Sequence, residues 1–290
     1  MSAPDSSELE HLFAALADST SEEVSELVLG RIVGLIPFGH HPFPYMDFLG
    51  DAVARTRIRQ RYGQDLNYLK LRRDWETCLG AERGVDLEDG VLLISRLDGD
   101  TEFTPETVRS RLDAMAAELK GRLGEVAPDD DFERLETFRR YVFDEQGFAG
   151  NQQEYYDPSN SFLSRMLDTK QGIPISLSVL CLLLARRLDL PLSGINFPGH
   201  FLVKYSREDY CMFLDPFNGG DLITENDCFF YLIRQGLEPS RRHLVEADSL
   251  TILKRMYRNL INIYSSRTDS ELKNELRQHF AILENASLQS

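Results

Sequence analysis

The run from Ile175 to Leu188 constrains the fold more than any other part of this sequence, because it is apolar on almost every side of a helix. A helix that is apolar all round belongs in the centre of a domain. Pro174 directly precedes the run, and proline suits the first turn of a helix, where its missing N–H is not needed. We therefore expect a central, buried helix that begins near Pro174.

After this helix the hydrophobic pattern changes from a helical period to an alternating one, which indicates strands joined by short turns. A buried helix followed by an antiparallel meander is typical of an α+β fold, not of a doubly wound parallel sheet. A helix is then expected from Glu225 to Arg234, capped by Thr224. The expected strands are Ser193–Phe197, Phe201–Tyr205, Tyr210–Leu214 and Leu222–Ile223.

Three regions are expected along the chain. Residues 1–130 show helical periodicity and end in a segment rich in glycine, proline and aspartate, which favours a boundary there. Residues 131–240 hold a helix expected from about Phe132 to Glu145, followed by the buried helix and the meander. Residues 241–290 form a helical pair, broken near Ser266–Asp269, that resembles a tetratricopeptide unit. One such unit cannot bury its own apolar face, so we expect it to pack on the rest of the protein.

The overall charge excludes several classes of partner. The formal net charge is −15 with an isoelectric point near 4.9, which disfavours phosphate backbones and anionic membranes. The sequence has no apolar run of about 18 residues and no secretory signal pattern, so we expect a cytoplasmic protein that neither spans nor binds a membrane. The four cysteines form no CxxC pair, and in a reducing compartment they stay as thiols.

One group of residues has the order along the chain that a catalytic site would need. Cysteine-protease-like folds place a nucleophile at the N-terminus of a buried helix, a histidine on a following strand and an acid or amide on the next. Here the helix begins at Pro174, His200 opens a strand, and Asp215 closes the next strand. A hairpin between these strands would bring His200 and Asp215 side by side.

Three stretches carry a family resemblance: GNQQEYYDPSNSFLSRMLDTKQGIPISLSVLCLLLARRLDLPL, INFPGHFLVKY and FLDPFNGG. Together they resemble the SirB-type branch of the transglutaminase-like superfamily, over about residues 131–240. The resemblance implies a papain- or transglutaminase-like core, with a central helix against an antiparallel sheet and flanking helices at both ends. It implies a cytosolic bacterial protein and names no substrate.

The resemblance assigns His200 and Asp215 to the superfamily's histidine and aspartate positions. No cysteine occupies the nucleophile position. An alignment without gaps places Pro174 there, and a shift of two residues places Ser176 there instead. Cys181 lies nearly two turns inside the helix, too deep to benefit from the helix N-terminus. Ser176 is therefore the main candidate nucleophile at the helix start, with Ser178 as the second candidate.

Each candidate residue also has a purely structural interpretation. Ser176 suits the first turn or cap of a helix, and a bond between His200 and Asp215 could simply fix the sheet edge. Asn160 and Asn218 are expected to fix turns that shape the site, as are Gly199 and Pro174. His40 and His41 have no third ligand at metal spacing. We therefore expect no metal and no cofactor.

Two functions follow from this pattern. The first is a non-enzymatic or regulatory module that binds a protein or peptide in the former active-site cleft, supported by the missing cysteine. The alternative is a Ser-His-Asp hydrolase or acyl transferase that acts on an amide or ester, supported by the retained His200 and Asp215. We predict that these two side chains are hydrogen-bonded at the mouth of a cleft. A Ser176 side chain turned into its own helix would favour the binding module.

Overall fold

The structure is a computed structural model that describes residues 6–80, 84–265 and 270–287. The chain divides into two compact units, Met1–Thr107 and Val108–Ser290. The expected division at residues 130 and 240 stays a prediction. Within the described ranges, no helix is both long and apolar enough to cross a membrane.

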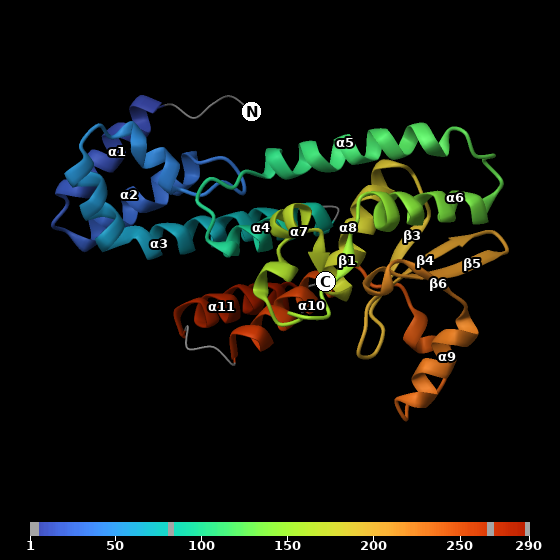
Figure 1. Ribbon diagram of the computed structural model, residues 1–290. Helices are drawn as coiled ribbons and strands as arrows, with labels where there is room; N and C mark the ends of the chain where they lie inside the picture. The colour runs from blue at the N-terminus through green and yellow to red at the C-terminus, as the bar shows by residue number, and fades with distance from the viewer. Residues whose placement is uncertain (1–5, 81–83, 266–269, 288–290) are drawn as a thin grey trace. The chain divides into compact units, whose positions relative to one another are not determined.

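The first unit is helical (Figure 1). Aspartate or serine side chains cap three of its helices: Ser21 accepts from Val24 N, Asp51 from Val53 N, and Asp86 from Glu88 N. Its core is formed by apolar side chains such as Phe13 and Ile32, which are fully buried. The elements are α1 (Ser6–Asp18), α2 (Glu22–Leu35), η1 (Phe43–Phe48), α3 (Ala52–Leu79), α4 (Leu87–Ser95), η2 (Arg96–Asp98) and the start of α5 (Pro105–Leu123).

The second unit combines helices with a small antiparallel sheet, which confirms the α+β prediction (Figure 1). Its elements are the rest of α5, α6 (Asp131–Arg139), η3 (Arg140–Glu145), β1 (Ala149–Gly150), η4 (Pro158–Ser161), α7 (Leu163–Thr169), β2 (Gln171–Gly172), α8 (Pro174–Arg187), β3 (Leu192–Ile195), β4 (Leu202–Arg207), β5 (Tyr210–Asp215), η5 (Pro216–Asn218), β6 (Asp221–Ile223), α9 (Glu225–Arg234), η6 (Arg241–Leu244), α10 (Ser249–Ser265) and α11 (Ser270–Ser287).

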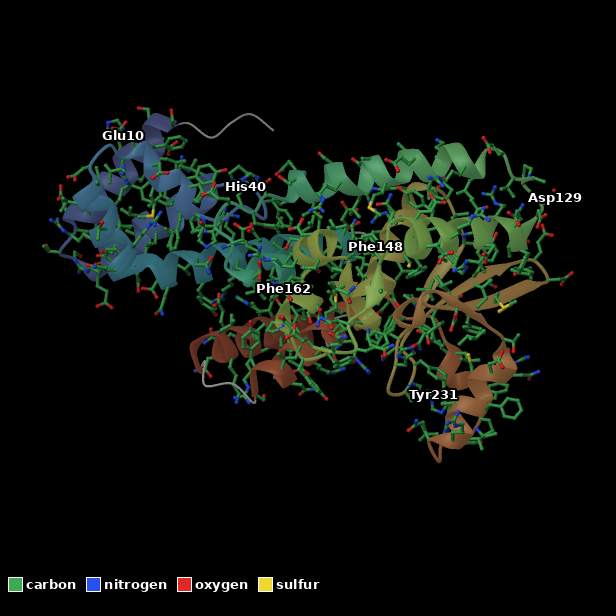
Figure 2. The ribbon with its side chains drawn as sticks, viewed as in Figure 1. Glu10, His40, Asp129, Phe148, Phe162 and Tyr231 are labelled. Carbon is green, nitrogen blue, oxygen red and sulfur yellow. The ribbon has the colours of Figure 1, made fainter. Side chains whose placement is uncertain are left out.

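The predicted central helix is α8. Every residue from Pro174 to Ala185 is buried, which confirms the interpretation of its all-round apolar pattern. Large aromatic side chains from preceding segments complete this interior: Phe148 and Phe162 are each 1% exposed (Figure 2). The N-terminus of α8 is therefore held rigidly by a dense core, which fixes whatever site is built beside it.

The four strands β3, β4, β5 and β6 form one antiparallel sheet in that order. Side chains alternate between its two faces. Leu202 and Phe213 pack with Cys228 and Leu232 of α9. On β4 and β5, Val203 and Leu214 are cross-strand partners and belong to the opposite face, where α8 packs against the sheet. The sheet thus lies between the buried helix and α9.

One predicted helix differs in its last part. The pattern predicted a single helix from Phe132 to Glu145, but α6 ends at Arg139 and continues as the π-helix η3. This turn buries Phe143, which lies against the turn after β5. Gly220 in that turn has φ +76°, and a Cβ there would lie 2.3 Å from the Phe143 ring. A glycine is needed at this point because of both constraints.

The C-terminal helical pair is formed by α10 and α11, which lie side by side (Figure 1). The predicted break near Ser266–Asp269 lies outside the described residues. As predicted, the pair packs on the rest of its unit, because α10 contacts α8 and η4. The side chains that α10 buries are Ile252, Leu253, Met256, Tyr257, Leu260 and Ile263.

The structure separates the cysteines by exposure: Cys78, Cys181 and Cys228 are buried and Cys211 is exposed. Burial raises the pKa of Cys78 to about 12 and raises that of Cys181 still further. A buried thiol with a raised pKa has almost no reactive thiolate at neutral pH.

A polar maleimide should therefore label Cys211 rapidly in the native protein and label Cys181 more than about a hundredfold more slowly. Peptide mass spectrometry after timed labelling measures both rates. In denaturant all four thiols should react at similar rates, which serves as the control. Native labelling of Cys181 as fast as Cys211 would contradict the buried position of α8.

Candidate functional site

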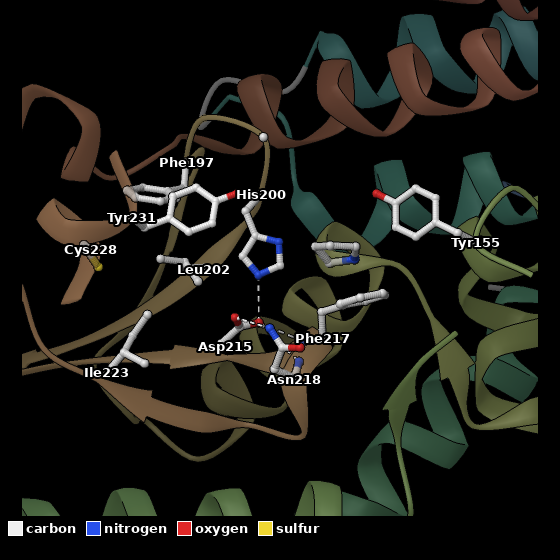
Figure 3. Close-up of a pocket in the computed structure, with 12 residues that line it drawn as sticks. Tyr155, Phe197, His200, Leu202, Asp215, Phe217, Asn218, Ile223, Cys228 and Tyr231 are labelled. Atoms are coloured by element: carbon white, nitrogen blue, oxygen red, sulfur yellow. Dashed lines mark hydrogen bonds and ion pairs between the residues drawn. The ribbon is translucent and has the colours of Figure 1, made fainter. Parts of the chain in front are cut away.

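His200 and Asp215 form the centre of the site, and their predicted hydrogen bond is confirmed. His200 Nε2 lies 2.8 Å from Asp215 Oδ1, and the two side chains are only 12% and 11% exposed (Figure 3). Asp215 is the last residue of β5, and His200 lies just before β4. The β4–β5 hairpin, which turns at Glu208 with φ +49°, brings the two residues together.

The Asp215 carboxylate is surrounded by donors. Besides His200, its Oδ1 accepts from the backbone N–H groups of Phe217 and Asn218 at 3.2 and 3.3 Å, and its Oδ2 accepts from Asn218 Nδ2 at 2.8 Å. Burial alone would raise the pKa of Asp215, but the bonds from His200 and Asn218 outweigh it and lower the pKa below its usual value. Asp215 is therefore ionised at neutral pH and acts only as an acceptor.

The charge on Asp215 fixes the role of the His200 ring. Because an ionised carboxylate cannot donate, Nε2 must carry the proton of the shared bond. The other ring nitrogen, Nδ1, has no hydrogen-bond partner within the described part of the chain. The backbone also positions the ring: Gly199 has φ +70°, and His200 N donates to Phe197 O at 3.0 Å, which closes a tight turn.

A cavity of about 440 Å³ opens beside this pair. Apart from His200, Asp215 and Asn218, its walls are mainly aromatic and aliphatic, which is the usual make-up of a ligand site. The lining residues are Tyr155, Pro174, Phe197, Gly199, His200, Leu202, Asp215, Phe217, Asn218, Ile223, Cys228 and Tyr231.

Aromatic rings contact one another around the cavity. Tyr155 and Phe217 meet nearly at right angles with centroids 5.7 Å apart, and the His200 and Phe217 rings lie 6.2 Å apart at 86°. Phe197 and Tyr231 form a third pair at 5.3 Å. Figure 3 shows Tyr155 and Tyr231 on opposite sides of His200, with their hydroxyl groups turned towards it. These contacts between rings, two of them edge to face and one tilted, hold the walls in place.

Pro174 and Ser176 are placed differently, although both lie in the first turn of α8. Pro174 lines the cavity with His200. Ser176 does not: its Oγ donates to Asn160 O at 2.6 Å and accepts from Ile173 N at 3.0 Å, and the residue is 2% exposed. This bond to the N-cap N–H is one half of a capping box. The Ser176 side chain is therefore turned into its own helix start.

The other side chains near His200 that could act as nucleophiles are either hydrogen-bonded to the backbone or buried with a raised pKa. Ser178 Oγ donates to Pro174 O at 2.8 Å inside α8. Cys228 lines the cavity from α9, but it is 1% exposed, and burial together with Asp227 and Glu225 raises its pKa to about 12. Neither group is poised as a nucleophile beside His200.

Asn160 shapes the site from outside the cavity. It is 1% exposed, its Nδ2 donates to Glu154 O at 2.7 Å, and its Oδ1 accepts from Asn151 Nδ2 at 3.1 Å. These bonds fold the polar loop that presents Tyr155. The structure thus brings His200, Asp215, Asn218, Gly199 and Pro174 together, whereas Asn160 and Ser176 support them from behind.

The aromatic walls of the cavity leave no distinct signal in the sequence. Tyr155 lies in a polar loop and Tyr231 on an amphipathic helix, and nothing local distinguishes them from other surface aromatics. Both are 36% exposed, as surface aromatic side chains are. No group of three or more histidine, cysteine or acidic side chains is arranged for metal binding among the described residues.

Comparison with known proteins agrees with this architecture. The family model of the transglutaminase-like superfamily matches residues 106–258, slightly more than half of the chain. Three bacterial relatives are UPF0162 proteins. The protein from Xylella fastidiosa is 38% identical over 46% of this chain and 50% of its own length. The one from Vibrio cholerae is 31% identical over 59% and 63%, and the one from Pseudomonas aeruginosa 35% over 57% and 60%.

A eukaryotic protein is also similar. F-box only protein 21 of Mus musculus is 33% identical over 44% of this chain and 21% of its own length. The matched region spans half to just under two thirds of the length of the bacterial relatives. No solved structure matches the chain significantly.

Proposed function

The chain belongs to the transglutaminase-like superfamily, and from this premise we propose that it is a non-enzymatic module that binds a protein or peptide in the cavity beside His200. The observation that carries the proposal is the first turn of α8. Proline, which has no nucleophilic atom, faces the cavity at this position, while the Ser176 hydroxyl is bonded to backbone groups behind it. The His200–Asp215 pair therefore has no nucleophile to activate.

The retained pair has a role in such a module. Asp215 ties β5, the following turn and His200 into one bonded unit, and thereby gives the cavity a fixed wall. A rigid, largely apolar cavity with few polar groups binds with little loss of side-chain entropy. This explains how both residues can be kept without catalysis.

The alternative function is a Ser-His-Asp hydrolase or acyl transferase that acts on an amide or ester. It is supported by the His200–Asp215 hydrogen bond, in which an acid orients a histidine ring whose other nitrogen faces away from the acid. For catalysis the Ser176 hydroxyl would have to leave its bonds to Ile173 N and Asn160 O, each worth about 0.5–1.5 kcal/mol. It would also leave a buried N–H without a partner, so this alternative ranks second.

The finer family assignment is part of the same proposal. The motifs around the site support a place in the SirB-type branch, with residues 131–240 as the core and residues 241–290 as a tetratricopeptide-like pair. The net charge of −15 supports a protein or peptide partner over nucleic acid or an anionic membrane. We place the protein in the cytoplasm, without a cofactor.

Activity-based probes test the absence of catalysis. A fluorophosphonate and a cysteine-reactive electrophile are applied to the full chain and to His200→Ala. We expect no fluorophosphonate adduct on Ser176, and cysteine labelling only at exposed Cys211, with the same rate in both proteins. Labelling of Ser176 that disappears in His200→Ala would replace the binding proposal with the hydrolase.

Peptide selection tests the binding function. Peptides are selected by display on the wild-type chain and then measured on Tyr155→Ala and Tyr231→Ala. We expect at least about tenfold weaker binding, because aromatic side chains that a ligand covers carry most of the energy of such contacts. Phe132→Ala is the matched control, since Phe132 is 52% exposed on α6 and does not line the cavity. Peptides insensitive to both tyrosine changes would place binding elsewhere.

A further inference from the structure

We propose that the cavity recognises an aromatic side chain that donates a hydrogen bond to His200 Nδ1, namely a tyrosine or tryptophan of the bound peptide. The inference rests on the proposed binding function and names its ligand class. It joins two features of the cavity, the ring nitrogen Nδ1 of His200 and the aromatic walls. Each of them follows from contacts of the described residues.

The acceptor is fixed by Asp215. Both carboxylate oxygens are engaged, Oδ1 by His200 and two backbone N–H groups and Oδ2 by Asn218 Nδ2. Because Nε2 donates to this carboxylate, Nδ1 is the ring nitrogen left to accept a hydrogen bond from a ligand. No described residue donates to Nδ1. In the free protein it is left to solvent.

The Nδ1 lone pair makes the cavity prefer a ligand that donates a hydrogen bond. When an apolar ligand covers His200, Nδ1 loses its contact with water. An unpaired buried acceptor costs free energy, whereas a ligand O–H or N–H restores the bond. A site of this kind discriminates against an analogue that fills the space without the donor. A phenylalanine side chain should therefore bind less well than tyrosine.

The walls select an aromatic ring. Four aromatic residues line the cavity, and Tyr155, Phe217 and His200 already pair edge to face. A volume of about 440 Å³ exceeds the roughly 150 Å³ of a cavity that holds benzene, so a ring and part of its backbone fit. No lysine or arginine lines the described cavity to pair with an anionic side chain, and both Asp215 oxygens already accept hydrogen bonds from the protein. These features favour a neutral side chain.

The test compares three small probes on the ¹⁵N-labelled full chain: N-acetyl-tyrosinamide, its O-methyl derivative and N-acetyl-phenylalaninamide. The O-methyl probe keeps the ring and removes the donor, and the phenylalanine probe removes the donor without adding bulk. We expect the tyrosine probe to bind with a dissociation constant on the order of 1 mM and about three- to tenfold tighter than the other two. Chemical-shift changes should centre on His200 and Tyr231.

His200→Phe removes the acceptor and keeps a ring, so the three probes should then bind with similar affinity. His11→Phe is the matched control, because His11 is exposed on α1, and it should keep the wild-type order. If His200→Phe does not fold, the order of the three probes on the wild-type chain still decides the result.

Equal affinities of the three wild-type complexes would overturn the inference, and so would shifts outside the cavity or no binding at about 10 mM. These results would leave the binding function itself standing if display-selected peptides still depend on Tyr155 and Tyr231. His200-dependent probe labelling of Ser176, by contrast, would overturn the proposed function and the inference together.

Discussion

Replacement of Asp74 by alanine should lower the free energy of unfolding of the first unit by about 3–5 kcal/mol. Lys70 Nζ donates to both Asp74 carboxylate oxygens, and Oδ2 also accepts from Arg96 Nη1 at 3.3 Å and from Gly39 N at 3.2 Å. Lys70, Asp74 and Arg96 are 1%, 3% and 3% exposed. Without the carboxylate, two buried cations would face each other.

Because Lys70 is buried, its positive charge depends on the Asp74 carboxylate. Burial lowers the pKa of Lys70 to about 8, although Asp74 acts to raise it. Removing the negative charge therefore forces the lysine to lose its proton or the surrounding helices to open, and either response costs stability.

Urea unfolding followed by tryptophan fluorescence measures the effect, because the chain has a single tryptophan, Trp75, which is fully buried beside Asp74 on α3. The matched control is Glu76→Ala on the same helix. Its ion pair with Arg72 is 53% and 58% exposed, so the loss should stay below about 0.5 kcal/mol. A loss below about 1 kcal/mol for Asp74→Ala would contradict the paired state of the buried cluster.

The second large effect is expected from Pro174→Cys, which should create a thiolate at neutral pH. Pro174 starts α8 and lines the cavity with His200, so a cysteine there would receive the field of the helix N-terminus and a basic partner. In such surroundings the pKa of a cysteine falls from about 8.5 to about 3.5–7.5. We expect a fall of about 2 units, which corresponds to about 2.7 kcal/mol in favour of the thiolate.

The pH profile of alkylation at residue 174, followed by peptide mass spectrometry, gives the midpoint directly. In the double variant Pro174→Cys with His200→Ala, the midpoint should rise by about 1 unit, because only the helix N-terminus remains. Ser176→Cys is the matched control: its side chain would replace a buried group bonded to Ile173 N and Asn160 O and should react slowly. A Pro174→Cys midpoint near 8.5 would show that this position is not the nucleophile slot.

Much of the fold was predictable because the relevant signals are local. The all-round apolar run gave α8 within one residue at each end, and the alternating segments gave the four strands within two residues. Thr224 predicted the start of α9, and the hairpin spacing predicted the His200–Asp215 bond. In each case the side-chain period or a turn residue reports directly on the burial of that segment.

Other features escaped prediction because competing local states are close in energy. The Phe132–Glu145 pattern suits an α-helix throughout, yet its last turn is a π-helix that places Phe143 against Gly220. Ser176 was compatible with a nucleophile and with a cap, and the choice depended on Asn160 O, a group sixteen residues away. Both outcomes depend on contacts between residues far apart in the chain, which a local sequence pattern does not report.

The sequence by itself thus determined α8, the four strands, their antiparallel connection and the pairing of His200 with Asp215. Only the tertiary structure decided which face of the first turn of α8 looks into the cavity, and that Tyr155 and Tyr231, from segments far apart in the chain, line it together. The physical reason is that periodicity records how deeply a residue is buried but not which distant residue it meets. Those long-range contacts depend on how α8, the sheet and α9 pack together.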